Sequence, residues 1–222
     1  MTESPPPAVK ICGLTRPEDA ALAAKLGARY VGTIMAGGPR QVTPQQARTV
    51  FAAAGDARRV VVFGDQPVEA VARVAEELSL DVVQLHGGAT VDALTWLAAR
   101  SAAARWAVVR LAGDEWPVST LDALAPVADG VLLDARVAGV LGGTGVALPW
   151  DRLADRVHAW RAAHPAVQVV LAGGLSPERV AEAIRWLSPD VLDVSSGIER
   201  APGIKDADRM RAFFDAVEHG HG

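Results

Sequence analysis

The chain has 222 residues, half of them hydrophobic, so it is long enough to form one large α/β domain with a sizeable core. Its formal net charge is −4 with acids and bases interspersed, which disfavours a nucleic-acid partner bound through a basic patch. The single cysteine, Cys12, excludes an internal disulfide and is typical of a reducing compartment. We find no signal-peptide pattern at the start and no apolar run near the roughly 18 residues that span a bilayer. We therefore expect a soluble, cytoplasmic protein with no membrane partner.

Short apolar runs recur along the whole chain, most of them bounded by Gly, Asp or Pro. They lack strict polar–apolar alternation, which is typical of strands buried on both faces of a parallel sheet. We expect eight strands, at Val9–Cys12, Tyr30–Ile34, Val60–Phe63, Val82–Gln84, Ala107–Arg110, Val131–Asp134, Val167–Leu171 and Val191–Val194.

Alanine-rich segments with helical spacing lie between these runs. They predict helices over residues 16–26, 44–53, 67–77, 90–100, 149–163, 177–187 and 207–218. After the fifth strand only residues 119–125 are available before Pro126, so we expect the fifth helix to be short or irregular.

Several of these helices begin with a recognisable start signal. Thr15 and Glu18 fit a capping box, while Thr43 and Ser176 each place a hydroxyl before a proline at the first helical position. Comparable starts occur at residues 65–67, 90 and 206.

Eight alternations of strand and helix predict a parallel sheet that closes into a single (β/α)8 barrel. We expect one domain over residues 1–222, with flexible ends at 1–8 and 219–222. A doubly wound open sheet is the alternative, but nothing after the first strand reads Gly-x-Gly-x-x-Gly. In a barrel, functional side chains lie at the carboxyl ends of the strands, which gives a short set of candidates.

Glycine-rich loops follow the sixth, seventh and eighth strands. Glycine lets backbone amides approach an anion closely, and nearby hydroxyls add donors. Any one loop is explained equally well as a tight turn, but three on neighbouring strands favour a phosphate site. The candidate phosphate-binding residues are Gly143, Gly145, Gly173, Gly174, Ser195, Ser196 and Gly197.

Cys12 and Asp134 are the candidate acid–base pair, because they end the first and sixth strands and could face each other across the barrel mouth. A thiolate is a base only if its pKa is lowered, and a carboxyl stays protonated at neutral pH only if it is buried. A lone cysteine is more often a small core residue, and Asp134 could instead anchor a loop. Lys10 points to the same face as Cys12, where it could lower the thiol pKa or pair with an interior carboxylate.

Arg40 and His86 are the other candidate binding residues. Arg40 follows two glycines and a proline, and its fork geometry suits a carboxylate, although a loop arginine is often only solvated. His86 could contact substrate or simply hold a loop carbonyl. The remaining histidines show no metal-ligand spacing, so we predict no metal site.

Together these motifs resemble the phosphoribosylanthranilate isomerase family of tryptophan biosynthesis. The resemblance extends in order from about Val9 to Phe214, and its first and last motifs are the most specific. It rests on Lys10-Ile11-Cys12-Gly13-Leu14-Thr15, Val62-Phe63, Gln84-Leu85-His86-Gly87, Leu132-Leu133-Asp134, Gly142-Gly143-Thr144-Gly145, Leu171-Ala172-Gly173-Gly174-Leu175, Asp193-Val194-Ser195-Ser196-Gly197-Ile198-Glu199 and Pro202-Gly203-Ile204-Lys205-Asp206.

The resemblance implies a cofactor-free Amadori rearrangement of a phosphorylated aminoribose. It implies that Asp134 is the general acid and Cys12 the general base, that Arg40 meets the anthranilate carboxylate, and that Asp193 assists. The loop at residues 32–40 departs from the family pattern, because phenylalanines and a serine are missing, and this could widen the anthranilate side of the pocket.

Two other functions remain open at this point. One is another phosphate-binding barrel enzyme, such as the related histidine-pathway isomerase, a sugar-phosphate epimerase or a lyase. The other is a non-catalytic barrel that binds a phosphorylated ligand, although such a protein needs neither Cys12 nor Asp134. The partner we expect is a small phosphorylated substrate, and the sequence leaves a monomer and a homodimer equally open.

Overall fold

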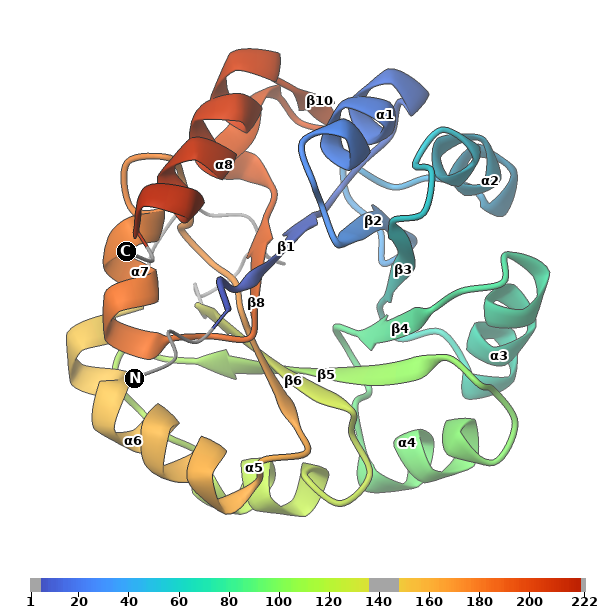
Figure 1. Cartoon of the computed structure of the whole chain (residues 1–222). Helices are drawn as coiled ribbons and strands as arrows, with labels where there is room; N and C mark the ends of the chain where they lie inside the picture. The colour runs from blue at the N-terminus through green and yellow to red at the C-terminus, as the bar shows by residue number, and fades with distance from the viewer. Residues whose placement is uncertain (1–4, 136–147, 221–222) are drawn as a thin grey trace.

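The computed structural model describes residues 5–135 and 148–220, and it contains a closed barrel of eight parallel strands in chain order (Figure 1). β1 pairs with both β2 and β8, which closes the ring. The predicted (β/α)8 barrel is confirmed, and each predicted strand overlaps an observed one. The strands are β1 Ala8–Ile11, β2 Tyr30–Ile34, β3 Arg58–Phe63, β4 Val82–Leu85, β5 Ala104–Leu111, β6 Gly130–Ala135, β7 Gln168–Leu171 and β8 Val191–Val194.

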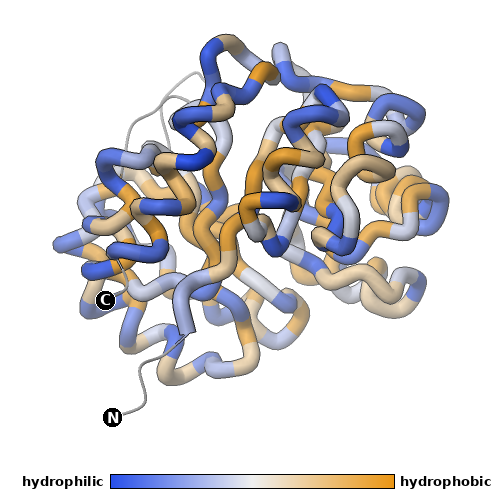
Figure 2. Tube along the Cα trace, turned by 45° about the horizontal axis from the view of Figure 1, so that its top comes forward, coloured by the Kyte–Doolittle hydropathy of each residue, from blue (hydrophilic) through white to orange (hydrophobic). Residues whose placement is uncertain are grey.

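Helices surround the barrel (Figure 1), and hydrophobic and hydrophilic segments alternate along the chain (Figure 2), as expected for helices with one buried face. The helices are α1 Pro17–Lys25, α2 Pro44–Ala52, α3 Val68–Glu77, α4 Val91–Ala98, α5 Val118–Leu124, α6 Trp150–Ala163, α7 Val180–Leu187 and α8 Ala207–Gly220. The short fifth helix is confirmed, with seven residues. In the part of the chain that the structure describes, no helix is long and apolar enough to cross a membrane.

Regular structure extends further toward both ends than the sequence predicted. Ala8 belongs to β1, where its amide donates to the Asp190 carbonyl, and His219 lies within α8. Strand pairing holds Ala8, and His219 belongs to the last turn of the helix.

Three of the predicted helix starts are observed. Thr43 forms a capping box with Gln46, the Thr90 hydroxyl accepts from the third amide of α4, and the Asp206 carboxylate accepts from two amides of α8. Each satisfies backbone donors that the first helical turn leaves without partners.

Two predicted starts are wrong. The cap of α1 is Arg16, because the Thr15 hydroxyl donates to the Gly203 carbonyl at 2.6 Å instead of accepting from the helix. Ser176 and Pro177 form a turn, and α7 begins only at Val180. α3 begins after Pro67 without a side-chain cap. The Thr15 hydroxyl therefore bonds to a group far away in the sequence and not to the first turn of the helix. A local sequence motif cannot reveal such a partner.

The barrel interior contains an apolar layer that supports the polar residues above it. Side chains two residues apart on a strand point to the same face, so Leu132 is followed by Asp134, and Val191 by Asp193, on the inner face. The apolar layer is a separate cluster of buried side chains formed by Tyr30, Val60, Val82, Trp106, Leu132, Val170, Ala172 and Val191. This packing fixes the strands whose carboxyl ends carry the site.

Candidate active site

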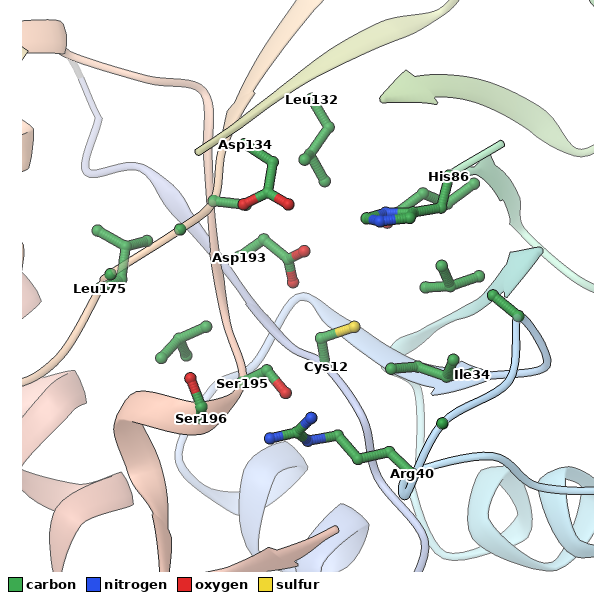
Figure 3. Close-up of a pocket in the computed structure, with 18 of the residues that line it drawn as sticks. Cys12, Ile34, Arg40, His86, Leu132, Asp134, Leu175, Asp193, Ser195 and Ser196 are labelled. Atoms are coloured by element: carbon green, nitrogen blue, oxygen red, sulfur yellow. The ribbon is translucent and has the colours of Figure 1, made fainter. Parts of the chain in front are cut away.

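A pocket opens at the carboxyl ends of the strands, and it contains the two side chains predicted as acid and base. Cys12, directly after β1, and Asp134, in β6, both line it, and both point toward its middle (Figure 3). Asp193 from β8 lies between them in this view. Residues 122 positions apart in sequence therefore meet in one site because the closed barrel gathers its strand ends.

The Cys12 thiol is buried close to a cation. The Cys12 amide donates to the Val194 carbonyl at 2.9 Å, which continues the pairing of β1 with β8 into the pocket. A side chain added at Gly32 would lie 3.4 Å from both the Cys12 Sγ and the Lys10 Nζ, so the two groups share the same corner. Burial raises the pKa of the Cys12 thiol, the negative charge of Asp193 raises it further, and the Lys10 charge opposes both.

Lys10 forms the buried ion pair that the sequence left open as an alternative. Its Nζ lies 2.8 Å from the Asp193 Oδ1 and 2.9 Å from the Gln84 Oε1, and its side chain is fully buried. Burial alone would lower the pKa of Lys10, but Asp193 and Cys12 outweigh it and raise the pKa. Lys10 therefore stays charged beside the thiol.

Asp134 lies in surroundings that favour its protonated form. Burial, helped by the nearby charge of Asp193, raises its pKa to about 6, although the Ala135 amide and Arg110 act in the opposite direction. Gly173 has a φ of +82°, and a side chain there would come within 2.8 Å of the Asp134 Oδ1. Only glycine lets the loop after β7 pass so close to this carboxyl group.

His86 lines the same pocket as a neutral side chain. Burial and the positive charges of Arg110 and Lys10 lower its pKa to about 4, so at neutral pH the ring carries no charge. Its amide donates to the Phe63 carbonyl at 2.8 Å, which fixes the backbone at the end of β4. A neutral imidazole can donate or accept a hydrogen bond, but it adds no charge to the site.

Arg40 lines the pocket and pairs with a residue that the sequence analysis did not single out. Its Nε and Nη2 lie 2.9 Å and 2.7 Å from the two carboxylate oxygens of Glu199. Glu199 also accepts from Lys205 at 2.8 Å. Both residues stand in motifs quoted above, but only the fold shows that they meet Arg40, which is 159 positions away from Glu199.

The predicted phosphate loops are placed in part. Gly173 and Gly174, both with positive φ, line the pocket together with Ser195 and Ser196. Gly197 is not among the described lining residues. A side chain there would collide with the Leu175 carbonyl oxygen, so this glycine lets two loops pack together. Gly143 and Gly145 lie outside the described residues.

The described residues contain no group of three His, Cys, Asp or Glu side chains that could hold a metal ion. The polar side chains of the pocket are a thiol, two carboxylates, a neutral imidazole, a guanidinium, the amide of Gln84 and two serine hydroxyls. Such a set can transfer protons and bind anions.

Comparisons with known proteins identify the family of the chain. The sequence model of the family described as N-(5'-phosphoribosyl)anthranilate (PRA) isomerase matches residues 9–216. An N-(5'-phosphoribosyl)anthranilate isomerase of Trichlorobacter lovleyi is 38% identical, covering 93% of this chain and 95% of the relative.

Solved structures of similar proteins share the fold. The phosphoribosyl anthranilate isomerase of Thermus thermophilus is 37% identical with a TM-score of 0.78, covering 96% of this chain and 98% of that one. Another phosphoribosyl anthranilate isomerase, in complex with reduced 1-(o-carboxyphenylamino)-1-deoxyribulose 5-phosphate, is 29% identical with a TM-score of 0.80, covering 96% and 99%. This chain therefore belongs to the N-(5'-phosphoribosyl)anthranilate isomerase family.

Proposed function

We propose that this chain catalyses the Amadori rearrangement of N-(5-phosphoribosyl)anthranilate to 1-(2-carboxyphenylamino)-1-deoxyribulose 5-phosphate by general acid–base catalysis. The observation that carries the assignment of roles is the meeting of Cys12 and Asp134 in one pocket with glycine and serine loops beside them. Membership of the family supplies the substrate, and it excludes a barrel that only binds its ligand. The same membership argues against the histidine-pathway and epimerase alternatives.

Asp134 is the general acid in this proposal. It donates a proton to the furanose ring oxygen, the bond from that oxygen to C1′ breaks, and the nitrogen lone pair forms an iminium at C1′. A carboxyl group with a pKa of about 6 holds its proton near neutral pH far better than an ordinary aspartate. Binding of the substrate excludes more water, which favours the protonated form further.

Cys12 is the general base, although its pKa is raised and not lowered as the sequence analysis required, so only the ionised fraction of the thiol acts. Its thiolate removes the proton from C2′, and the electrons of that bond neutralise the iminium and give an enolamine. Tautomerisation then places a proton on C1′ and removes one from the oxygen on C2′, so C2′ becomes the ketone. The oxidation at C2′ and the reduction at C1′ occur within one molecule, so the reaction needs no electron carrier.

Other lining residues bind the two charged ends of the substrate. The guanidinium of Arg40 suits the anthranilate carboxylate. Backbone amides of Gly173 and Gly174 and the hydroxyls of Ser195 and Ser196 suit the phosphate, at the strand ends where barrels commonly bind one. His86 and Asp193 line the same pocket.

We propose that one chain supplies the whole catalytic unit, as a single domain that works either as a monomer or as a homodimer. The proposed acid, the proposed base and the anion-binding residues named above all come from one chain, which supports this proposal. Light scattering on the purified protein will distinguish the two forms.

The test is turnover in the variants Cys12→Ala and Asp134→Asn, followed by the fluorescence of phosphoribosylanthranilate as it is consumed. Each change should lower turnover by about 10²- to 10⁴-fold, the usual contribution of a general acid or base. Asp129→Asn is the matched control, since this half-exposed carboxylate precedes β6 at the opposite end of the strand from Asp134. Near-normal turnover in either folded variant would reject the assigned role.

A further inference from the structure

A hairpin next to the pocket supplies the partners of Arg40. Its strands β9 Glu199–Ala201 and β10 Ile204–Lys205 pair antiparallel, and the register sets Lys205 opposite Glu199. The two residues between the strands are Pro202 and Gly203, and Gly203 has a φ of +78°, as the third position of a type II turn requires. The hairpin therefore places a glutamate and a lysine side by side.

The hairpin is fixed to the barrel at two points. The Thr15 hydroxyl donates to the Gly203 carbonyl at 2.6 Å, and the Lys205 amide donates to the Asp19 carboxylate at 3.1 Å. Asp19 is held in turn by Arg16. These contacts tie the hairpin to the start of α1, just after the loop that carries Cys12.

Glu199 and Lys205 are almost completely buried. The side chains are 4% and 0% exposed, and the Glu199 Oε1 accepts from the Lys205 Nζ at 2.8 Å and from the Gly203 amide at 3.2 Å. Lys205 Nζ also donates to the Cys12 carbonyl at 2.5 Å, which links the hairpin to the backbone of the proposed base. A buried carboxylate with this many donors has a fixed position.

The loop that carries Arg40 offers little support of its own. A side chain added at Gly37 or Gly38 would meet nothing within 4 Å, so the Cβ side of these two residues faces open space. An arginine at the end of such a loop has many rotamers to lose when it binds an anion. Contacts outside the loop therefore help to place the side chain: its stem packs over Gly13, and Glu199 supplies the hydrogen bonds to its guanidinium.

Geometry and charge leave one side of Arg40 for a ligand. Glu199 engages the side formed by Nε and Nη2, and among the described residues Nη1 has no hydrogen-bond partner, while Arg40 lines the pocket. Arg40 and Lys205 are two cationic side chains against the single carboxylate of Glu199, although burial lowers the pKa of Lys205. An anionic ligand would add a second negative partner to this group of three.

We propose that Glu199, fixed by Lys205, is a positioning residue that orients the Arg40 guanidinium toward the carboxylate of the substrate. The inference rests on the proposed function, because it takes Arg40 as the group that meets this carboxylate. Glu199 itself touches no substrate atom. It acts by fixing one side of the guanidinium before the ligand arrives.

The test compares two ligands that differ only at the carboxylate. One is reduced 1-(o-carboxyphenylamino)-1-deoxyribulose 5-phosphate, and the other is the same compound without the carboxyl group. In Glu199→Gln, which keeps the side-chain size, we expect the Kd of the first ligand to rise about tenfold, as for loss of a charged hydrogen bond, and that of the second to change less than about twofold. In turnover, KM should rise while kcat stays near normal.

Controls separate positioning from a general structural effect. Glu77→Gln also removes a carboxylate paired with an arginine, but on the exposed surface of α3, and it should change neither Kd. In an Arg40→Ala background, adding Glu199→Gln should cost less than about a further twofold, because the residue it acts through is gone. If Glu199→Gln fails to fold, Glu199→Asp is measured with the same ligands and should show a smaller, still carboxylate-selective, loss.

The outcomes distinguish the two levels of the argument. Equal weakening of both ligands by Glu199→Gln, with Arg40→Ala still selective for the carboxylate, overturns the positioning role and leaves the proposed function intact. If Arg40→Ala itself weakens both ligands equally, the role of Arg40 fails, and the role of Glu199 fails with it. An additive double variant also overturns the inference.

Discussion

The interior of the barrel has an apolar half and a polar half, although the same strands build both. Toward the amino-terminal ends of the strands, Tyr30 and Trp106 pack with their ring centroids 4.9 Å apart among valines and leucines. Toward the carboxyl ends, Lys10, Asp134 and Asp193 are also buried, with 0%, 7% and 8% of their surface exposed. The two halves therefore differ mainly in chemistry.

This difference places the residues that stabilise the fold in one half of the barrel interior and the proposed catalytic residues in the other. Burial of apolar side chains stabilises the fold in proportion to the area removed from water. Burial of ionisable side chains costs free energy, and the structure shows this cost as the raised pKa of Asp134 and the raised pKa of the Cys12 thiol. The polar half should thus carry the activity at the expense of stability, and variants can test each half separately.

The largest stability effect is expected in the apolar half, from Trp106→Ala. The indole is completely buried, and the absence of a side chain at Gly130 makes room for it, since a Cβ there would lie 2.7 Å from the ring. Truncation should lower the free energy of unfolding by about 3–5 kcal/mol, because it leaves a large void in a packed core. Urea denaturation measures the loss, and kcat of the folded fraction should remain near normal.

Trp186→Ala is the matched control for this variant, because Trp186 is 36% exposed on α7. We expect it to change the free energy of unfolding far less than Trp106→Ala does. Similar losses in the two variants would contradict the division into halves, as would a loss of kcat in the folded Trp106→Ala protein.

A smaller effect of opposite sign is expected in the polar half, from Asp134→Asn. The folded-state pKa of about 6 lies above the unfolded value of 3.8, so the native state binds more protons between these pH values. The contribution of this group to stability is therefore fully present below pH 3.8 and is lost as the pH rises through 6. At pH 7.5 the variant should exceed the wild type by about 2–3 kcal/mol, and at pH 4 the difference should be close to zero.

Paired denaturation curves of the wild type and of Asp134→Asn at the two pH values measure this effect. The variant should be the more stable protein where it is the less active one. A stability difference that does not depend on pH would show that burial of the carboxylate is not its cause.

The finest test is the pH dependence of kcat/KM, which reports groups of the free enzyme. The proposed active form has Asp134 protonated and Cys12 ionised. Since the acid has the lower pKa, activity should rise with pH up to about 6, stay level through neutrality and fall above the raised pKa of the thiol. Asp193→Asn removes a negative charge that raises both pKa values, so both limbs of the profile should move to lower pH.

Lys10 strengthens the expected shift, because it loses its carboxylate partner in Asp193→Asn and stays next to the thiol. An upward movement of either limb would contradict the charge assignments around Cys12. Glu77→Gln should leave the whole profile unchanged, since it alters only an exposed pair.

The fold could be predicted because its signals are local and repeated. Apolar runs bounded by turn residues gave all eight strands, and Pro126 limited the fifth helix. The errors at Thr15 and Ser176 have a different origin. Thr15 hydrogen-bonds a carbonyl 188 positions away, and no short motif specifies such a partner.

The site could be predicted only where strand ends determine it. Cys12 and Asp134 were found because each ends a strand, and the barrel brings strand ends together. The ion pairs of Arg40 with Glu199 and of Glu199 with Lys205 were missed, because they depend on a hairpin that follows the last barrel strand. The sequence signal that could have indicated this hairpin is an acid and a lysine on either side of a Pro-Gly pair.

The position of the single cysteine also makes the protein easy to observe. Cys12 is the chain's only sulfhydryl, and it lines the pocket, so any thiol-selective reagent labels one known place. The rate of labelling then measures how often that place is open to solvent, and a molecule seated in the pocket should shield it. The rate of Cys12 labelling in the wild-type protein therefore reports whether a ligand occupies the pocket, and no engineered label is needed.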